Sequence, residues 1–347
     1  MNEESPSDLI EQGHEQARRG NLQGSITWYE RAATLARTEG NDESEMDALY
    51  ELSVAYDNMG ENQKCIEMAS HLLARARQVQ NEQYQMQATF ALAATLAYLD
   101  LPGRWRELKP LLLEGRQIAR DLGDRSFEIM HLIWLGDCTI EMGGEEEGFS
   151  ILQEALNLIR PELVDCDYLF GKVYKALSQL MYKRGVYVEA IRYAEMSIGA
   201  FQKYGYPDHV VGVQLELARA RHAQGESSEA RRLIRHAWLQ GRKMHVKYIE
   251  QKAEYLISEL ERDSGHHREA ETAARQALKL AQEMKEKEPE VKSMLMLGQA
   301  LLANKQLTEA REVLTQAHRL SQERDYADHF NKAEELLEGI DSSADAI

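Results

Sequence analysis

The adjacent histidines His266 and His267 are the side chains of this sequence that most resemble metal ligands. Imidazole binds zinc and other transition metals, but a structural zinc site needs four ligands. Neighbouring residues do not share a helix face, and no cluster of Cys, His or carboxylate residues completes a ligand set around the pair. We therefore expect a solvated turn at these histidines and no metal.

The segment GGEEEG, residues 143–148, superficially resembles a glycine-rich phosphate loop. Its carboxylates would repel phosphate, and the sequence before it does not read as a strand. The sequence also contains no nucleophile elbow, no zinc-protease motif and no set of kinase motifs. We therefore predict that the protein is not an enzyme, has no catalytic residue and uses no cofactor.

Composition narrows the class of partner. The chain has 347 residues and a formal net charge of −17, which argues against nucleic acids and anionic membranes because both bind Lys- and Arg-rich surfaces. The most apolar stretch, residues 88–99, is too short to cross a bilayer. The N-terminus is acidic and does not resemble a signal peptide. The cysteines Cys65, Cys138 and Cys166 lie far apart, as is typical of a reducing compartment, so we expect a cytoplasmic protein without membrane insertion.

The strongest pattern is a repeat. Gly185, Gly225 and Gly265 recur at intervals of 40 residues, and each is followed five residues later by an alanine, namely Ala190, Ala230 and Ala270. A fixed period of this length is typical of a solenoid of helix pairs. Twelve residues before each alanine lies another small residue. Two helices can cross closely only where both side chains are small, so these positions predict the crossing points of antiparallel helices.

The pattern extends over most of the chain. The small residues on the first helix of each pair are Gly13, Ser53, Ala93, Gly136, Ser178, Ala218, Ser258 and Gly298. In every repeat but the last, a glycine follows the first helix and favours the left-handed conformation that ends a helix. The segment around Tyr326, Phe330 and Leu337 has apolar residues at helical spacing, and it predicts a terminal helix that covers the last pair.

These positions resemble those of the tetratricopeptide repeat (TPR) family, in a long-repeat form similar to LGN-type adaptors, Rap-type regulators and the maltose-regulon activator. The resemblance implies an all-α, right-handed α-solenoid of about eight helix pairs. We expect disorder over residues 1–6, one domain over 7–323, a capping helix over 325–340 and a disordered tail over 341–347.

Two prolines interrupt the regular pattern. Pro110 falls inside the second helix of repeat three and should kink or restart it, and Pro161 should end the second helix of repeat four. The superhelix is expected to bend irregularly at these places. Trp105 precedes Pro110 in an irregular turn. Packing of its ring on Pro102 and Leu108 is favoured over exposure as a binding hot spot.

In the TPR family the first helices of the pairs line a concave groove that binds peptides. The resemblance places several side chains of the later repeats on that groove. They are Lys172, Lys175, Gln179, Tyr182, Lys183, Arg219, His222, Lys252, Tyr255 and Arg262. Cations and tyrosines together suit an acidic segment or a terminal carboxylate. The alternative is that charges on a solvated face vary by chance, since lysines also keep such a face soluble.

These expectations favour an intracellular adaptor that holds a protein or peptide segment in the groove. The alternative is a signal-responsive regulator whose superhelix closes on a small peptide or metabolite, as the Rap-type and maltose-activator resemblance implies. Those regulators carry an effector module ahead of the repeats, whereas repeat one begins here near residue 7, and this favours the adaptor.

Overall fold

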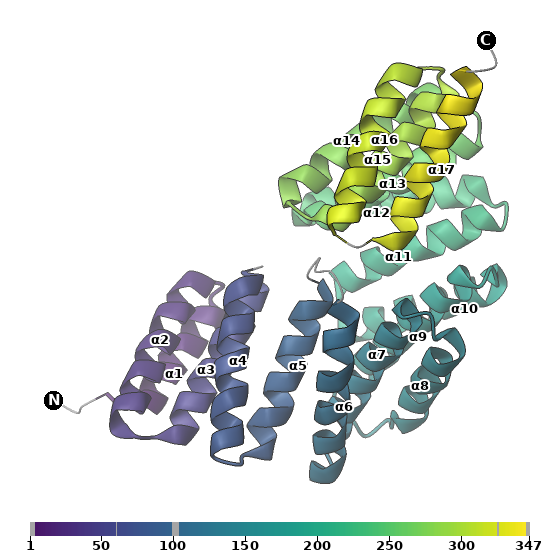
Figure 1. Ribbon diagram of the computed structural model, residues 1–347. Helices are drawn as coiled ribbons and strands as arrows, with labels where there is room; N and C mark the ends of the chain where they lie inside the picture. Colours follow the sequence, from purple (N-terminus) through teal and green to yellow (C-terminus); the bar gives the residue numbers. More distant parts are fainter. Residues whose placement is uncertain (1–3, 60, 99–103, 325, 345–347) are drawn as a thin grey trace. The chain divides into compact units, whose positions relative to one another are not determined.

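A computed structural model describes residues 4–59, 61–98, 104–324 and 326–344, and within them the chain forms helices and no strand. The helices, which are labelled in Figure 1, group by their contacts into two compact units, α1 to α8 and α9 to α17. The predicted all-α fold of paired helices is confirmed. The two units meet between Val164 and Asp165, in the irregular segment that follows Pro161.

The first unit contains α1 (Pro6–Arg18), α2 (Leu22–Glu39), α3 (Asp42–Asn58), α4 (Asn62–Gln78), α5 (Glu82–Tyr98), α6 (Arg104–Leu122), α7 (Arg125–Glu141) and α8 (Glu145–Leu158). The second unit contains α9 (Cys166–Lys183), α10 (Tyr187–Tyr204), α11 (Pro207–Ala223), α12 (Ser227–Met244), α13 (Lys247–Asp263), α14 (His267–Met284), α15 (Lys287–Ala303), α16 (Leu307–Glu323) and α17 (Ala327–Ala344).

Within each unit, every helix packs against the next one along the chain. The odd-numbered helices also contact one another, so that α9, α11, α13, α15 and α17 form one continuous layer in the second unit. This layer brings side chains from successive repeats onto a common surface. In the described part of the chain, no helix is both long and apolar enough to cross a membrane.

The predicted crossing points are confirmed. Ala218 on α11 and Ala230 on α12 are both fully buried. At two other crossings a serine hydroxyl donates a hydrogen bond to a backbone carbonyl of the opposite helix, from Ser178 to Ala190 and from Ser258 to Ala270, each at 2.8 Å. Small side chains therefore allow the two helices of a pair to approach closely enough for contact between a side chain and the opposite backbone.

The turns within the pairs use the left-handed conformation that the glycines predict. Gly225 has a φ angle of 95°, and a Cβ atom there would meet nothing within 4 Å. The last pair has no glycine at this position, and Lys305 adopts a φ angle of 61° instead. A left-handed residue lets the amide groups after the helix reach its last carbonyls, so a similar short turn recurs in those pairs whose turns lie wholly within the described residues.

Of the two outcomes expected at Pro110, a kink or a restart of the helix, the restart does not occur, because α6 runs unbroken through this residue. Proline removes one backbone donor, but Leu108 and Leu112 are fully buried on either side and keep the chain helical. Trp105 packs against the same apolar cluster, and its carbonyl accepts a hydrogen bond from the Cys138 thiol at 3.2 Å. The ring is thus partly buried, in agreement with the favoured interpretation. Pro102 lies outside the described residues.

The N-terminal helix begins earlier than predicted. The Ser5 hydroxyl accepts from the Asp8 amide at 3.2 Å, and the Asp8 carboxylate accepts from the Ser5 amide at 3.0 Å. This capping box fixes Ser5 and places Pro6 in the first turn of α1, so disorder does not extend through residue 6. Residues 1–3 lie outside the described part of the chain.

The C-terminal helix closes the second unit. Ala333 and Ile340 of α17 are buried in a cluster with residues of α15 and α16, while Glu334, Glu335 and Glu338 are exposed. A polar outer face is what a terminal helix of a solenoid requires. The helix extends through Ala344, beyond the predicted end at 340, and residues 345–347 lie outside the described part.

Two clusters of charged side chains connect neighbouring helix pairs of the second unit. The position that carries the cation in one cluster carries the carboxylate in the other. In the first, Arg221 of α11 donates to Glu195 of α10 at 2.7 Å and also pairs with Glu226 in the following turn. The cation therefore lies on the first helix of the pair, and its two carboxylates lie on the preceding helix and in the following turn.

In the second cluster these charges are exchanged. Glu261 of α13 pairs with Arg231 of α12 and accepts from His266 Nδ1, in the following turn, at 2.9 Å. Glu261 is only 7% exposed, so its ionised carboxylate depends on these partners. Neighbouring repeats consequently use complementary rather than identical charges at similar places.

Candidate functional site

All of the predicted groove residues lie on α9, α11 and α13 of the second unit. Lys172, Lys175, Gln179, Tyr182 and Lys183 are on α9, Arg219 and His222 are on α11, and Lys252, Tyr255 and Arg262 are on α13. Positions three, four and seven residues apart share one side of a helix. We call the surface formed by these side chains the A-helix face. Most of them are half-buried, whereas Gln179 and Lys183 are exposed.

Glu216 of α11 is the main residue that sequence reasoning missed. Its carboxylate pairs with the Lys252 ammonium of α13 and accepts from Gln179 Nε2 of α9 at 3.0 Å. Burial would raise the pKa of Glu216, but the charge and hydrogen bond of Lys252, the charge of Lys175 and the bond from Gln179 outweigh it and lower that pKa to about 2. Glu216 therefore stays ionised and links three helices.

Arg219 occupies the next turn of α11. Its guanidinium lies over the Tyr182 ring, 4.4 Å from the centroid, and its Nε atom lies 3.6 Å from a carboxylate oxygen of Glu259 on α13. The Nε atom is buried and makes no hydrogen bond. Tyr255 lies in the same charged environment, and burial raises its pKa to about 12, so the phenol is neutral at physiological pH.

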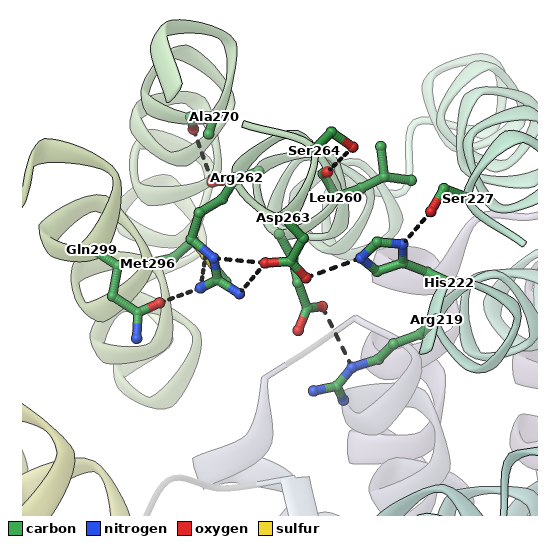
Figure 2. A network of polar contacts seen from close by, with 12 residues as sticks. Arg219, His222, Ser227, Leu260, Arg262, Asp263, Ser264, Ala270, Met296 and Gln299 are labelled. Carbon is green, nitrogen blue, oxygen red and sulfur yellow. Dashed lines mark hydrogen bonds and ion pairs between the residues drawn. The ribbon is translucent and has the colours of Figure 1, made fainter. Parts of the chain in front are cut away.

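A line of polar contacts crosses three repeats at the end of the A-helix face (Figure 2). His222 Nδ1 lies 3.0 Å from the Ser227 hydroxyl, and His222 Nε2 lies 3.0 Å from an Asp263 oxygen. Arg262 donates to Asp263 at 2.9 and 3.0 Å and to Gln299 of α15. Burial would raise the pKa of Asp263, but the bonds from His222 and Arg262 lower it. His222 is thus fully engaged within the protein.

The internal carboxylates change the character of the predicted site. Glu216, Glu259 and Asp263 neutralise the cations of α11 and α13. The same face carries the further cations Lys172, Lys175 and Lys183 on α9.

The N-terminal end of the face is aromatic. The ring of Tyr168 on α9 lies 5.7 Å from that of His209 on α11 and 5.1 Å from that of Tyr206. Burial lowers the pKa of His209, and Lys172 and Lys175 lower it further, whereas Asp208 opposes them.

In the first unit the corresponding positions carry acidic and polar side chains. Asp47 accepts a hydrogen bond from the Tyr84 hydroxyl at 2.6 Å, and burial raises the pKa of Asp57. Tyr50 is half-buried beside them. Among the described residues of the first unit, this surface shows no cationic cluster comparable to that of α9.

The residues considered for chemistry lie apart from one another. His266 bonds to Glu261, and among the residues that the structure describes no group of three His, Cys, Asp or Glu side chains could hold a metal. Cys65 and Cys138 are buried, and burial raises the pKa of the Cys138 thiol to about 11. A thiol with so high a pKa is protonated and a poor nucleophile at neutral pH.

Comparison with known proteins agrees with the helix pairs. Residues 291–324, which lie in α15 and α16, match the tetratricopeptide repeat model. No curated protein sequence matches the chain significantly. The resemblance to tetratricopeptide repeats is confirmed in this segment by the match, and the solved structures that resemble the chain show that its fold is a TPR-like α-solenoid.

Three of these solved structures cover most of the chain. The quorum sensor NprR from B. thuringiensis, in its apo form, is 13% identical with a TM-score of 0.69, over 91% of this chain and 87% of its own. A Rap protein complexed with Competence and Sporulation Factor is 13% identical, with a TM-score of 0.62. The match covers 87% of this chain and 89% of the Rap protein.

The third is a signal transduction ATPase with a tetratricopeptide repeat sensor from Pyrococcus horikoshii. It is 16% identical with a TM-score of 0.60, and the match covers 92% of this chain. The chain spans 50% of the length of that ATPase. At these identities the likeness concerns the fold.

Proposed function

We propose that the protein is a non-enzymatic interaction module that holds a protein or peptide segment against the A-helix face of its second unit. The observation that carries this proposal is the row of half-buried cations and tyrosines on α9, α11 and α13, which neighbouring helices hold in place. Side chains already fixed by internal bonds lose little freedom when a ligand binds.

The bound segment is proposed to be acidic on the side of α9. Lys172 and Lys175 supply its attraction, and Tyr182 and Tyr255 offer apolar surface next to them. The strongly negative chain as a whole would repel nucleic acid, so we propose a protein partner in the cytoplasm.

A signal-responsive regulator is the second candidate. The likeness to a quorum sensor and to a Rap protein in complex with Competence and Sporulation Factor favours it, because each match covers most of both chains. In this version the segment is a short signalling peptide, and the protein passes the binding event to another partner.

A random dodecapeptide library displayed on phage tests binding directly. The full chain is expected to enrich peptides that contain Asp or Glu, and Lys172→Gln/Lys175→Gln is expected to lose them. The matched control is Arg235→Gln/Lys279→Gln, which removes two exposed cations from α12 and α14. Arg219 is unsuitable for this test, because its loss leaves Glu259 without its cation and confounds stability with binding.

Added salt should weaken the binding of the enriched peptides, because it screens the charges of Lys172 and Lys175. Enrichment of no peptide, or of the same peptides by the lysine variant, would show that this face is not the binding surface.

A further inference from the structure

Ser227, His222 and Asp263 form a continuous line of hydrogen bonds at the end of the A-helix face (Figure 2). The Ser227 hydroxyl lies 3.0 Å from His222 Nδ1, and His222 Nε2 lies 3.0 Å from an Asp263 oxygen. A hydroxyl next to an imidazole that a carboxylate orients is the arrangement that activates a serine as a nucleophile. This arrangement is recognised by its geometry and not by the order of the residues in the chain, so the three side chains qualify for it.

The charge on Asp263 sets the direction of the two hydrogen bonds. Burial would raise the pKa of Asp263, but the bonds from His222 and Arg262 lower it, so the carboxylate is ionised and can only accept. His222 Nε2 therefore donates to Asp263. In the neutral imidazole Nδ1 is then the acceptor, and the Ser227 hydroxyl donates to it. The imidazole is thus placed to take the hydroxyl proton when Ser227 attacks an electrophile.

The equivalent positions of the other pairs in the second unit carry different residues. The positions of His222 and Ser227 are occupied there by residues of other types, namely Tyr182 with Tyr187, Arg262 with His267, and Leu302 with Leu307. The rings of the two tyrosines lie 5.6 Å apart, so an aromatic contact joins the helices of that pair. The place of Asp263 is taken by alanine on α11 and on α15. The packing of a helix pair therefore does not require a serine, a histidine and an aspartate.

Burial suits the roles of these two side chains. The His222 side chain is only 16% exposed, which shields its hydrogen bonds from competition with water. Ser227 is half-buried, so part of it remains open to solvent. A small reagent can therefore reach the hydroxyl while the base stays fixed behind it.

The N-terminus of α12 adds stabilisation of negative charge beside the hydroxyl. Ser227 is the first residue of this helix, and the first helical backbone bond runs from the Ala230 amide to the Glu226 carbonyl at 3.0 Å. The amides of the first turn thus have no carbonyl partner within Ser227–Met244. Such amides favour the negative charge that develops on an ester oxygen during attack. The Glu226 carboxylate would oppose this effect, but it pairs with Arg221.

We propose that Ser227 is a nucleophilic serine that accepts an acyl group from an activated ester, with His222 as the base and Asp263 as the residue that positions the base. The Ser227 oxygen forms a bond to the ester carbonyl carbon while its proton passes to His222 Nδ1. The bond from that carbon to the leaving oxygen then breaks, and the proton passes to the leaving alcohol. The products are O-acylated Ser227 and one alcohol. This covalent modification of the protein is independent of the proposed binding of a peptide segment.

Acetylation by p-nitrophenyl acetate tests the proposal on the full chain. Peptide mass spectrometry locates the acetyl groups and follows their appearance with time. Ser228 is the internal control, because it is the next residue of the same helical turn and is exposed. Ser227 should be acetylated about 100-fold faster than Ser228, since a positioned general base contributes roughly 10²- to 10⁴-fold. Equal rates at the two serines in the wild-type chain would overturn the proposal.

Two variants separate reactivity from a purely structural role. His222→Gln should reduce the rate at Ser227 to that at Ser228, because glutamine can bond to the hydroxyl but cannot take its proton. Asp263→Asn should lower the rate at Ser227 at least about tenfold and leave that at Ser228 unchanged. Thermal melts establish that each variant is folded, and the wild-type ratio of rates decides the question if one is not. If His222→Gln melts at a lower temperature but is acetylated at Ser227 as fast as wild type, the three side chains only join the helices, and the proposal is wrong.

Discussion

His131 on α7 is an imidazole enclosed by the first unit. It is fully buried, its Nδ1 lies 2.7 Å from the Phe127 carbonyl, and its ring lies 5.7 Å from that of Phe90. Burial lowers the pKa of His131 from 6.5 to about 4, although the Phe127 carbonyl and Asp124 oppose that shift. The folded protein therefore binds this proton less readily than the unfolded chain does.

Acid should destabilise the protein partly through this residue. As the pH falls from 6.5 toward 4, His131 binds a proton in the unfolded chain but not in the folded state. The free energy of unfolding should therefore drop by up to about 3 kcal/mol. Thermal melts of wild type and His131→Gln at pH 7 and at pH 4.5 check this. The drop between the two pH values should be smaller for the variant, and equal drops would contradict the assignment.

The Glu216–Lys252 pair is expected to be strongly coupled. Each partner is mostly buried, so Glu216→Gln or Lys252→Met alone should cost about 1–3 kcal/mol by leaving a desolvated group without its partner. The double variant should lose less than the sum of the two. The exposed pair Lys332–Glu335 serves as control, and its coupling should be below about 1 kcal/mol. Denaturant unfolding of both cycles gives the comparison, and equal coupling energies would disprove it.

The sign of the pH dependence at this pair follows from the lowered pKa of Glu216. Its contribution to stability is fully present above the ordinary pKa of 4.5 and disappears as the pH falls toward about 2. Glu216→Gln should remove this dependence and leave that of His131, which acts at higher pH.

At the scale of helices, small residues at the crossings set the distance between partners. Ala230→Leu should lower the free energy of unfolding by about 1–3 kcal/mol, because Ala218 and Ala230 are fully buried and leave no space. Ala74→Leu is the matched control, since Ala74 lies exposed inside α4. Thermal melts of the two variants give the measure, and similar melting temperatures would contradict close packing at this crossing.

The helix pairs could be predicted because their signals are local and periodic. Gly225 and Gly265 mark left-handed turns, and Ala218 and Ala230 mark a crossing, without knowledge of any distant contact. The continuity of α6 through Pro110 could not be predicted in this way. It depends on apolar packing of the whole helix, which outweighs the loss of one hydrogen bond.

At the scale of the whole chain, the placement of the chosen side chains on α9, α11 and α13 could be predicted, but their partners could not. Glu216 lies at a position that the family pattern does not assign to the groove, and it pairs with Lys252 in the next repeat. The available signal was a carboxylate in one repeat and a cation about one period later, as in Glu216 and Lys252. The sequence of a single repeat does not contain both members of such a pair, so its cation has no evident partner.

The exchanged charges around Arg221 and Glu261 have a consequence for how such a gene can change. Recombination between similar repeats tends to delete or duplicate whole periods, and the helical pattern alone would tolerate this. Loss of residues 207–246 would join α10 directly to α13 and bring Glu261 toward Glu195 in place of Arg231. A buried carboxylate would then face another carboxylate.

A chain with this deletion should therefore be less stable than one that also carries Glu195→Arg, although both keep the same number of helices. Thermal melts of the two shortened proteins would measure the difference. If the deletion without Glu195→Arg had the higher melting temperature, these repeats would be interchangeable units. The expected result would mean instead that each repeat depends on the charges of its natural neighbours, so that the order of the repeats cannot be changed without loss of stability.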